Sequence, residues 1–281
     1  MMWDTIMTTD AHSHRVSVVT ICLDHKDGLE RTLASVAAQT WHDMEHIVID
    51  GGSADGSVQL LKAHVAEKAF AFLSEPDSGI YDAMNKGWRM ADGELVVFMN
   101  AGDTFASETV IGEYAQSYAG EVWRWGYGCA RICNANGQLR AIKSFVPFRI
   151  DRLALGLSTV PHQATVMERE LLEELGGFRI AAGLAADQEL LLRAALVCPP
   201  RLWGEFFADF EDGGVGSSRP PSAHVRDMGR FRNELGLHVA GGRVLDRLTT
   251  IALTVFKAAE AYQHIMRQQR KLHGKQLFDA R

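Results

Sequence analysis

The sequence predicts an α/β fold in which helices cover both faces of a mostly parallel sheet. Short apolar runs rich in β-branched residues recur along the first part of the chain, and amphipathic segments with helical spacing lie between them. Alternation of this kind is typical of β-α-β units, which build parallel sheets. The runs are apolar almost throughout, which indicates strands buried on both faces. The 281 residues, 47% of them hydrophobic and 23% charged, suit one large soluble domain or two small ones.

The first part of the chain contains four predicted strands and three predicted helices. The strands are expected at residues 16–22, 46–50, 70–75 and 94–100, and the helices at 28–39, 57–68 and 79–91. Each helix carries apolar residues on one face: Leu29, Leu33, Val36 and Ala37 in the first, Val58, Leu61 and Val65 in the second, and Tyr81, Met84, Trp88 and Ala91 in the third. These faces are expected to pack against the sheet.

The pattern changes after about residue 120. Segments 121–128 and 130–142 have the pattern of antiparallel strands, and Asn136-Gly137 is a strong signal for a hairpin turn. A further strand is expected at 163–167, a helix at 186–196 and a glycine- and proline-rich loop at 212–222. We therefore divide the chain into a tail (1–14), a first half (15–120), a second half (121–216) and a C-terminal helical segment (217–281).

The C-terminal segment contains a long helix candidate at residues 241–275. Its apolar stripe consists of Leu245, Leu248, Ala252, Val255, Ala259 and Tyr262, and its end is basic, with Arg267, Arg270, Lys271 and Lys275. One interpretation is that the stripe packs on the domain or on a second subunit of a homo-oligomer. The alternative is peripheral contact with a membrane, because basic residues beside an apolar stripe suit anionic lipids.

Composition and charge exclude several classes of protein. A net charge of −6 argues against broad nucleic-acid binding. The four cysteines (Cys22, Cys129, Cys133 and Cys198) form no Cys-x-x-Cys pair, which favours a reducing compartment. No His or Cys cluster accompanies Cys129 and Cys133, so small buried thiols are favoured over a zinc site. The first fourteen residues contain Asp4 and Asp10 and lack an apolar stretch, so we expect no signal peptide, and no apolar run reaches roughly 18 residues. We expect a cytoplasmic protein, with the inner face of the membrane as an alternative location.

Acids follow three of the predicted strands. Asp50 ends the second, Asp77 follows the third, and Asp103 follows the fourth. Parallel sheets bind ligands at the carboxyl ends of their strands, so one sheet would bring these acids to one edge. The sequence lacks both the dinucleotide fingerprint after the first strand and a P-loop. Instead, "DGGSADGS" (50–57) offers Asp50 to ribose hydroxyls. The alternative is a simple turn with Asp55 or Ser53 as a helix N-cap.

Several segments together resemble one family. "VSVVTICLDHKDGLERTLASVAAQTWHDMEHIVIDGGSADGS", "SEPDSGIYDAMNKG" and "ELVVFMNAGDTF" are similar to the nucleotide-sugar half of a GT-A fold, family 2 glycosyltransferase. "PHQATVMERELLEELGGF" and "AADQELLLR" resemble the acceptor half of that family. The resemblance covers residues 15 to 216. The enzymes that the chain resembles are inverting family 2 glycosyltransferases of the bacterial polysaccharide or glycolipid type. It implies a GT-A (Rossmann-like) fold with a nucleotide-sugar-binding half at 15–120 and an acceptor-binding, catalytic half at 121–216.

The resemblance implies a metal ligand at Asp103. In the family, an acid at this strand end binds Mg²⁺ or Mn²⁺, which bridges the two phosphates of the donor. A hard divalent ion prefers one or two carboxylates plus phosphate oxygens. Ala101 and Gly102 would let the backbone approach the sugar phosphate, although the family often has a second Asp where this chain has Asn100 or Gly102. The alternative is that Asp103 caps the helix expected after Phe105.

Further site residues follow from the resemblance. Those expected at the nucleotide-sugar donor are Thr20, Asp24, Asp50 and Asp55 around the nucleoside, Asp77 near the ribose or base, and Asn85 and Lys86 from the helix that begins near Gly79. Lys86 would offset negative charge on the phosphates or the sugar, or else form an i,i+4 ion pair with Asp82. Asp24 lies where the family often has Asn.

Asp187 is the expected catalytic base. Direct displacement at the anomeric carbon of the sugar needs a group that removes the proton of the acceptor hydroxyl, and the family supplies it from this position. The alternative is that Asp187 caps the helix that follows it. His162 and Gln163 match a His-Gln pair of the family and are expected beside the acceptor and the donor sugar, while a structural role is the alternative for His162.

The expected function is therefore metal-dependent transfer of a sugar from a nucleotide-diphospho-sugar to a hydroxyl of a glycan or lipid-linked acceptor. A second hypothesis is a catalytically silent nucleotide-sugar-binding or assembly subunit, since one metal-binding acid is missing. A nicotinamide-dependent oxidoreductase is disfavoured because the glycine fingerprint is absent.

Overall fold

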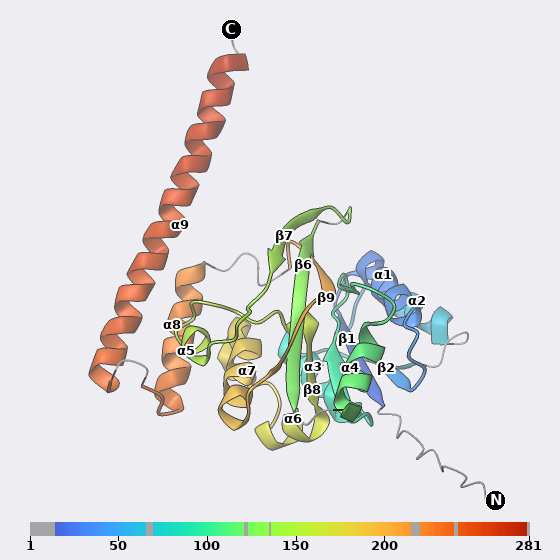
Figure 1. The fold of residues 1–281 in the computed structure, drawn as a ribbon. Helices are drawn as coiled ribbons and strands as arrows, with labels where there is room; N and C mark the ends of the chain where they lie inside the picture. Colours follow the sequence, from blue (N-terminus) through green and yellow to red (C-terminus); the bar gives the residue numbers. More distant parts are fainter. Residues whose placement is uncertain are drawn as a thin grey trace, which may run out of the picture. The chain divides into compact units, whose positions relative to one another are not determined.

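The computed structural model of the chain describes residues 15–65, 70–120, 123–134, 136–214, 220–238 and 241–279, with side chains except at 65, 120 and 264–279 (Figure 1). The proposed tail at 1–14 lies outside these residues. The described chain forms two compact units. The first contains residues up to 148 together with 160–180 and 193–212, and the second contains 149–159, 181–192 and the described residues after 212.

The first unit is built on one mixed sheet. Its strands are β1 (Val16–Cys22), β2 (Met44–Asp50), β3 (Ala71–Ser74), β4 (Leu95–Phe98), β5 (Thr104–Phe105), β6 (Trp125–Cys133), β7 (Leu139–Lys143), β8 (Thr165–Glu168) and β9 (Arg201–Glu211). The order is β3-β2-β1-β4-β8-β6-β9-β5, and β7 pairs with β6. Strands β3, β2, β1 and β4 are parallel, whereas β8 is antiparallel to both β4 and β6. The α/β class is thus confirmed, and the sheet becomes mixed after β4.

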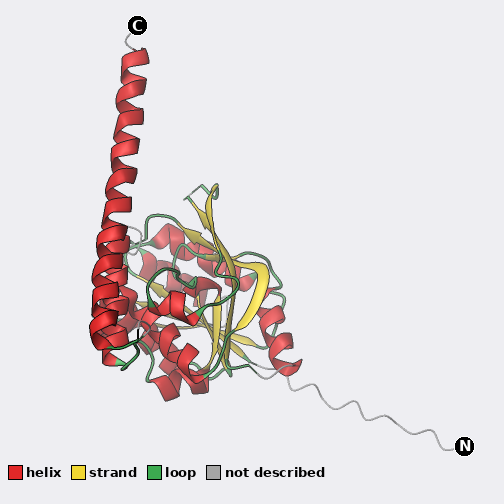
Figure 2. Cartoon of the chain, turned by 60° about the vertical axis from the view of Figure 1, so that its left-hand side comes forward, coloured by secondary structure: helices red, strands yellow, loops and turns green. Residues whose placement is uncertain are grey.

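Helices pack on both faces of the parallel strands, as Figure 2 also shows. The helices of this unit are α1 (Lys26–Ala37), α2 (Ser57–Val65), α3 (Ile80–Met90), α4 (Val110–Gly120) and α6 (Arg169–Leu175). On one face, Val18 lies in a buried cluster with Val36 of α1 and Tyr114 of α4. On the other face, Gly87 of α3 lies directly against Val19 and Ile49. Neighbouring residues of β1 therefore face different helices, which explains why the strand is apolar throughout.

Most elements predicted for the first part are confirmed. The four strands and three helices lie within a few residues of their expected positions. Ala37, expected on the apolar face of its helix, is exposed because α1 ends there. The side chain of Val65 lies outside the described residues.

The prediction for residues 121–142 needs one correction. The hairpin is confirmed, because β6 and β7 pair antiparallel and Gly137 has a φ of +74°. However, the boundary expected between the segments 121–128 and 130–142 does not exist, because residues 125–133 form one continuous strand. Gly128 lies inside it, where a Cβ would come within 2.7 Å of Phe207, so this glycine serves close packing rather than a turn.

The second unit is helical. It contains α5 (Ile150–Ala154), the first residues of α7 (Ala186–Val197), α8 (Pro221–Glu234) and α9 (Arg243–Asp279). Pro221 starts α8, a common position for proline, so α8 begins inside the range predicted as a loop (212–222), of which residues 215–219 lie outside the described residues. None of the described helices is both long and apolar enough to cross a bilayer.

A buried ion pair joins α8 to α9. The Arg232 side chain is fully buried, and its Nε lies 3.1 Å from Oδ1 of Asp246. Arg232 also donates to the carbonyl oxygen of Ala154 and, over 2.6 Å, to Oγ1 of Thr250. The inner face of α9 is therefore polar in its first turns.

The predicted stripe of α9 does not pack within the second unit. Its six residues (Leu245, Leu248, Ala252, Val255, Ala259 and Tyr262) are all exposed, because the helix turns its polar side toward α8. Packing on the same domain is thus the wrong interpretation for this unit, while a second subunit or a membrane surface stays a prediction. The basic side chains Arg267, Arg270, Lys271 and Lys275 lie outside the described side chains.

Candidate functional site

The three strand-end acids of the first unit lie at one edge of its sheet. Asp50 pairs with Cys22 at the ends of β2 and β1. A Cβ on Gly51 would lie 2.5 Å from Oδ2 of Asp77, so the loop after β3 reaches the end of β2. The backbone N–H of Ala101 donates to the carbonyl oxygen of Ile21 over 3.0 Å, which joins the end of β4 to β1. Glu211, the last residue of β9, lies next to Asp103. We call Asp50, Asp77, Asp103 and Glu211 the acidic rim.

Asp50 is the most deeply placed acid of the rim. Its side chain is fully buried, and its Oδ2 accepts hydrogen bonds from the backbone N–H groups of Gly52 and Ser53 (3.0 Å each) and from the Ser74 hydroxyl (2.8 Å). Its Oδ1 is buried and has no hydrogen-bond partner in the described part of the chain. Buried carboxylate oxygens are rarely left unpaired, so a donor from a ligand would complete this site.

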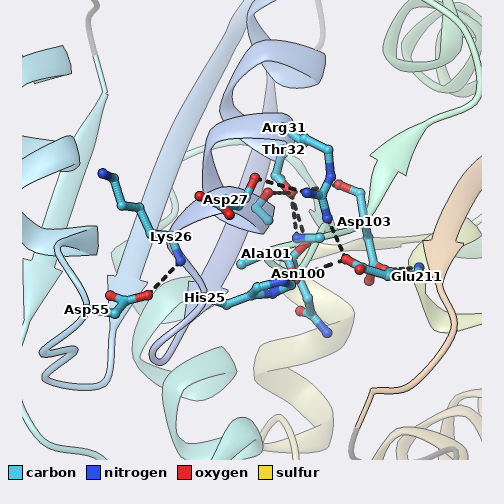
Figure 3. Close-up of polar contacts among 12 residues, drawn as sticks. His25, Lys26, Asp27, Arg31, Thr32, Asp55, Asn100, Ala101, Asp103 and Glu211 are labelled. Carbon is cyan, nitrogen blue, oxygen red and sulfur yellow. Dashed lines mark hydrogen bonds and ion pairs between the residues drawn. The ribbon is translucent and has the colours of Figure 1, made fainter. Parts of the chain in front are cut away.

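Asp24 and Asp55 hold the 50–57 loop in place. Asp24 has a left-handed backbone (φ 48°), and its Oδ1 accepts from the Ala54 N–H over 2.7 Å. Asp55 accepts from the Lys26 N–H over 2.7 Å, a bond drawn in Figure 3. It also accepts from the Ser57 hydroxyl (2.6 Å) and N–H (3.0 Å), and these bonds lower the pKa of its carboxyl. Both acids therefore have positioning contacts at the ends of α1 and α2.

Thr20 and Asn85 lie in the interior rather than at the edge. Thr20 has no exposed surface, and its hydroxyl hydrogen-bonds to Nε2 of His46 over 2.9 Å. Asn85 is 3% exposed. Its amide donates to the Phe178 carbonyl (2.8 Å) and accepts from the Phe178 N–H and the Trp88 ring N–H (2.9 Å each). These contacts fit a structural role better than ligand binding.

Lys86 is engaged by acids beside the rim. Its Nζ lies 2.8 Å from Glu75, 3.1 Å from the Pro76 carbonyl oxygen and 3.9 Å from Asp82. The hydrogen bond to Glu75 is the main cause that raises the pKa of Lys86. The expected i,i+4 pair with Asp82 therefore forms, but the contact with Glu75 is the shorter one.

A buried threonine shapes the 100–103 turn. Thr32 of α1 donates from its hydroxyl to the Asp103 carbonyl oxygen over 2.7 Å and accepts from the Gly102 N–H over 3.0 Å (Figure 3). Gly102 has a φ of +100°, and a Cβ there would lie 2.7 Å from Oε2 of Glu211. The positive φ favours glycine at this position, and a larger residue would also have to displace the Glu211 carboxylate.

Asp103 faces a second carboxylate across this turn. Its Oδ1 accepts from the Glu211 N–H over 3.1 Å, and the Gln163 side chain also hydrogen-bonds to it. Burial raises the pKa of the Asp103 carboxyl to about 7, and the nearby Glu211 carboxylate adds to the rise. Glu211 in turn lies 2.6 Å from Nη2 of Arg31 and 3.7 Å from Nε2 of His25 (Figure 3).

His162 and Gln163 lie at the turn that follows β4, where Gln163 contacts Asp103 and His162 contacts Asn100. His162 accepts at Nε2 from the Asn100 amide over 3.3 Å. Oδ1 of Asn100 is buried and has no hydrogen-bond partner among the described residues. The two predicted neighbours of the donor sugar thus contact residues of the 100–103 turn, which contains the predicted metal ligand.

The side-chain oxygen atoms of the 100–103 turn suit a hard divalent cation whose remaining ligands come from a bound substrate. Asp103 offers a carboxylate that burial makes costly to ionise, and Asn100 offers an unpaired amide oxygen. Within the described residues, no group of three or more His, Cys, Asp or Glu side chains could hold a metal by itself. The protein would therefore supply only part of the coordination shell, as is usual for Mg²⁺.

Asp187 belongs to the second unit. It lies in the first turn of α7, is half-buried, and its Oδ2 accepts from the Gln188 amide over 2.8 Å. Asp187 is the second residue of α7, and a carboxylate in the first turn of a helix is stabilised by the helix dipole.

Sequence reasoning missed His25, Arg31, Thr32 and Glu211. Glu211 is the last residue of the long strand β9, so an acid at a strand end is the signal that could identify it. The sequence does not predict β9, and Glu211 is therefore not recognised as such an acid. For the three residues of the segment around α1, no pattern in the sequence singles out contacts with residues far along the chain.

Comparison with known proteins gives consistent matches. The family model described as "Glycosyl transferase family 2" matches residues 17–176. A glycosyltransferase of Mycobacterium tuberculosis, described as uncharacterized, is 40% identical over 233 residues, which cover 81% of this chain and 87% of that protein. A PGL/p-HBAD biosynthesis glycosyltransferase of Mycobacterium bovis is 28% identical over 182 residues, which cover 59% of this chain and 63% of that protein.

Solved structures match at lower identity. TarS of S. aureus in complex with UDP has a TM-score of 0.60 and 16% identity, over 84% of this chain and 69% of that one. In another TarS structure, the match covers only 39% of that chain. The mannosyltransferase PcManGT of Pyrobaculum calidifontis, in complex with GDP-Man and Mn²⁺, has a TM-score of 0.58 and 19% identity, over 93% of this chain and 81% of that one. Identities this low support the fold alone.

Proposed function

The chain belongs to glycosyl transferase family 2 and has the GT-A fold, and from this we propose that it transfers a sugar from a nucleotide-diphospho-sugar to a hydroxyl of a glycan or glycolipid, with inversion. The observation that carries the proposal is the acidic rim, where Asp103 and the half-paired Asp50 lie at one edge of the sheet. A protein of Borreliella burgdorferi that is 29% identical over 34% of this chain is described as a cholesterol galactosyltransferase, and TarS, which is similar in fold, has been solved with UDP-GlcNAc.

The nucleoside is assigned to the Asp50 end of the rim. Oδ1 of Asp50 can accept a hydrogen bond from the base or the ribose, while Oδ2 is held by the loop. Asp77 lies against Gly51, and a Cβ on the same glycine would lie 3.3 Å from the exposed side chain of Leu23. An apolar side chain beside two acids can contact a base and hydrogen-bond its polar edge. Asp24 and Asp55 would orient this loop.

The diphosphate is assigned to the Asp103 end. Asp103 would hold a Mg²⁺ or Mn²⁺ ion, with Asn100 and Glu211 as nearby oxygen donors, and Gly102 would let the diphosphate approach the backbone. The bound cation would supply positive charge that stabilises the departing nucleotide diphosphate. PcManGT, solved with Mn²⁺ and GDP-Man, supports the choice of ion.

Asp187 is assigned the proton transfer. In one displacement, the acceptor oxygen attacks the anomeric carbon from the side opposite the diphosphate, so that configuration inverts. As that bond forms, the hydroxyl proton passes to the Asp187 carboxylate. His162 and Gln163 would border the donor sugar and position it for attack.

The free thiols of all four cysteines support a reducing, cytoplasmic location.

The test is a panel of UDP-, GDP- and dTDP-sugars with Mn²⁺. A donor that binds raises the unfolding temperature by mass action, and transfer releases its nucleoside diphosphate when an acceptor extract is added. We expect one base class to give both signals. No stabilisation by any donor would contradict the proposal.

A second candidate is a silent nucleotide-sugar-binding or assembly subunit. It is favoured by the absence of a second acid in the 100–103 turn and of a complete metal-ligand group within the described residues. The same panel separates the two, because a silent subunit would be stabilised by a donor but would release no nucleoside diphosphate with any acceptor.

A further inference from the structure

The outer face of α9 is apolar and exposed. We use this name for Val244, Leu245, Leu248, Ile251, Val255, Phe256 and Tyr262, whose exposed fractions lie between 54% and 74%. A helix on the surface of a globular protein normally turns such residues toward the core. In α9, the polar residues face inward instead, so the fold of one chain leaves its most apolar helix face uncovered.

This orientation is fixed by specific contacts with α8. Arg232 and Asp246 form a buried ion pair, and Gly229 lets Thr250 approach the backbone of α8 closely. The apolar residues of α8, in contrast, pack toward α5 and the residues that follow it. A Cβ on Gly156 would lie only 3.1 Å from Cα of Val225. Rotating α9 to bury its outer face would move Asp246 and Thr250 away from Arg232 and leave a buried guanidinium without its carboxylate, which is strongly unfavourable.

The spacing of the exposed residues is that of a helix-helix seam. Leu245, Leu248, Ala252, Val255, Ala259 and Tyr262 follow one another at alternating intervals of three and four residues. This 3.5-residue repeat directs side chains toward a partner helix along its length. Val244, Ile251 and Phe256 widen the seam, as in helices that pack in bundles rather than in a two-stranded coil.

Length and area also require more than α8. The 37 residues of α9 extend about 55 Å, whereas the 14 residues of α8 extend about 21 Å. Seven large side chains exposed to this degree leave on the order of 600–700 Å² of apolar surface open. That approaches the roughly 800 Å² per partner of a standard interface and exceeds what single chains usually expose.

We propose that the outer face of α9 binds the same face of a second copy of this chain, so that two α8–α9 pairs form a helical bundle. A second copy suits the seam because the contact is isologous and the face is self-complementary in chemistry. Among the described side chains that flank the seam, Lys257 and Glu260 pair with each other over 2.7 Å. This proposal does not depend on the proposed glycosyl transfer.

The test is the mass of the full chain in solution, measured by sedimentation equilibrium over a range of concentrations. We expect a dimer or a closed multiple of it. The double variant Leu248→Glu with Val255→Glu should weaken self-association on the order of 100-fold or more, because it places charges in the seam. Arg247→Glu, at an exposed position beside the seam, is the matched control and should leave the mass unchanged.

Two readouts keep the test decisive. The substituted residues are exposed in one chain, so circular dichroism of the double variant should show an unchanged helix content. A wild-type chain that is monomeric at every concentration would overturn the proposal. So would a monomer that sediments with phosphatidylglycerol vesicles and loses that binding in the double variant, since the partner would then be a membrane.

Discussion

The two units distribute polar and apolar groups in opposite ways. In the first unit, the strand interior is apolar and the acids gather at one edge, where two buried oxygen atoms have no partner among the described residues. In the second unit, an ion pair is buried and the apolar side chains of α9 are exposed. Each departure from ordinary packing indicates a missing partner: a polar small molecule in the first case and an apolar surface in the second.

Removing the proposed base should have the largest effect. Asp187→Asn keeps the shape of the side chain but cannot take a proton, so transfer should fall about 10²–10⁴-fold. Donor affinity, measured by calorimetry, should change little, because the acidic rim belongs to the other unit. Asp151→Asn, a surface acid of the same unit paired with Arg149, is the control and should retain activity. Near wild-type turnover of Asp187→Asn would refute the assignment.

Breaking the buried ion pair tests the polar interior of the second unit. Arg232→Ala leaves Asp246 buried without its cation, which should lower the free energy of unfolding by about 3–5 kcal/mol in urea titrations. Replacing both partners, with Arg232→Met and Asp246→Leu, should recover most of this loss. If the single variant costs less than about 1 kcal/mol, the pair does not determine how α9 packs.

Removing the proposed metal ligand tests the first unit. Asp103→Ala should weaken donor binding in the presence of Mn²⁺ by on the order of 10–100-fold, since Asp103 is the one carboxylate among residues 100–103. Asp92→Ala, at an exposed acid near the opposite end of β4, is the matched control and should bind normally. Equal affinity of Asp103→Ala and wild type would place the metal elsewhere.

The same residue should make stability depend on pH. The folded pKa of Asp103 is raised to about 7, so the folded state binds its proton more tightly than the unfolded state, whose value is about 4. Through this group, the free energy of unfolding falls as pH rises from about 4 to 7. Asp103→Asn should therefore be more stable than wild type by about 3–4 kcal/mol at pH 8 with EDTA, and the gain should vanish below pH 4. A pH-independent difference would contradict the buried carboxylate.

The sequence predicts the parallel strands well because local pattern determines them. Strand β1 is apolar throughout since both faces are covered, and that pattern is visible without a structure. Long-range contacts are not: Glu211 lies 108 residues from the aspartate whose carboxylate it faces. For α9, the periodicity identifies the apolar stripe correctly, but only the partner of its polar face, Arg232, reveals that the stripe points outward.

A crystal structure of the protein with a non-hydrolysable nucleotide-diphospho-sugar and Mn²⁺ tests the central claim most directly. We expect the nucleoside to donate a hydrogen bond to Oδ1 of Asp50 and the cation to bind Asp103 together with the diphosphate. A donor bound away from both aspartates, with Oδ1 of Asp50 still unpaired, would contradict the proposed site.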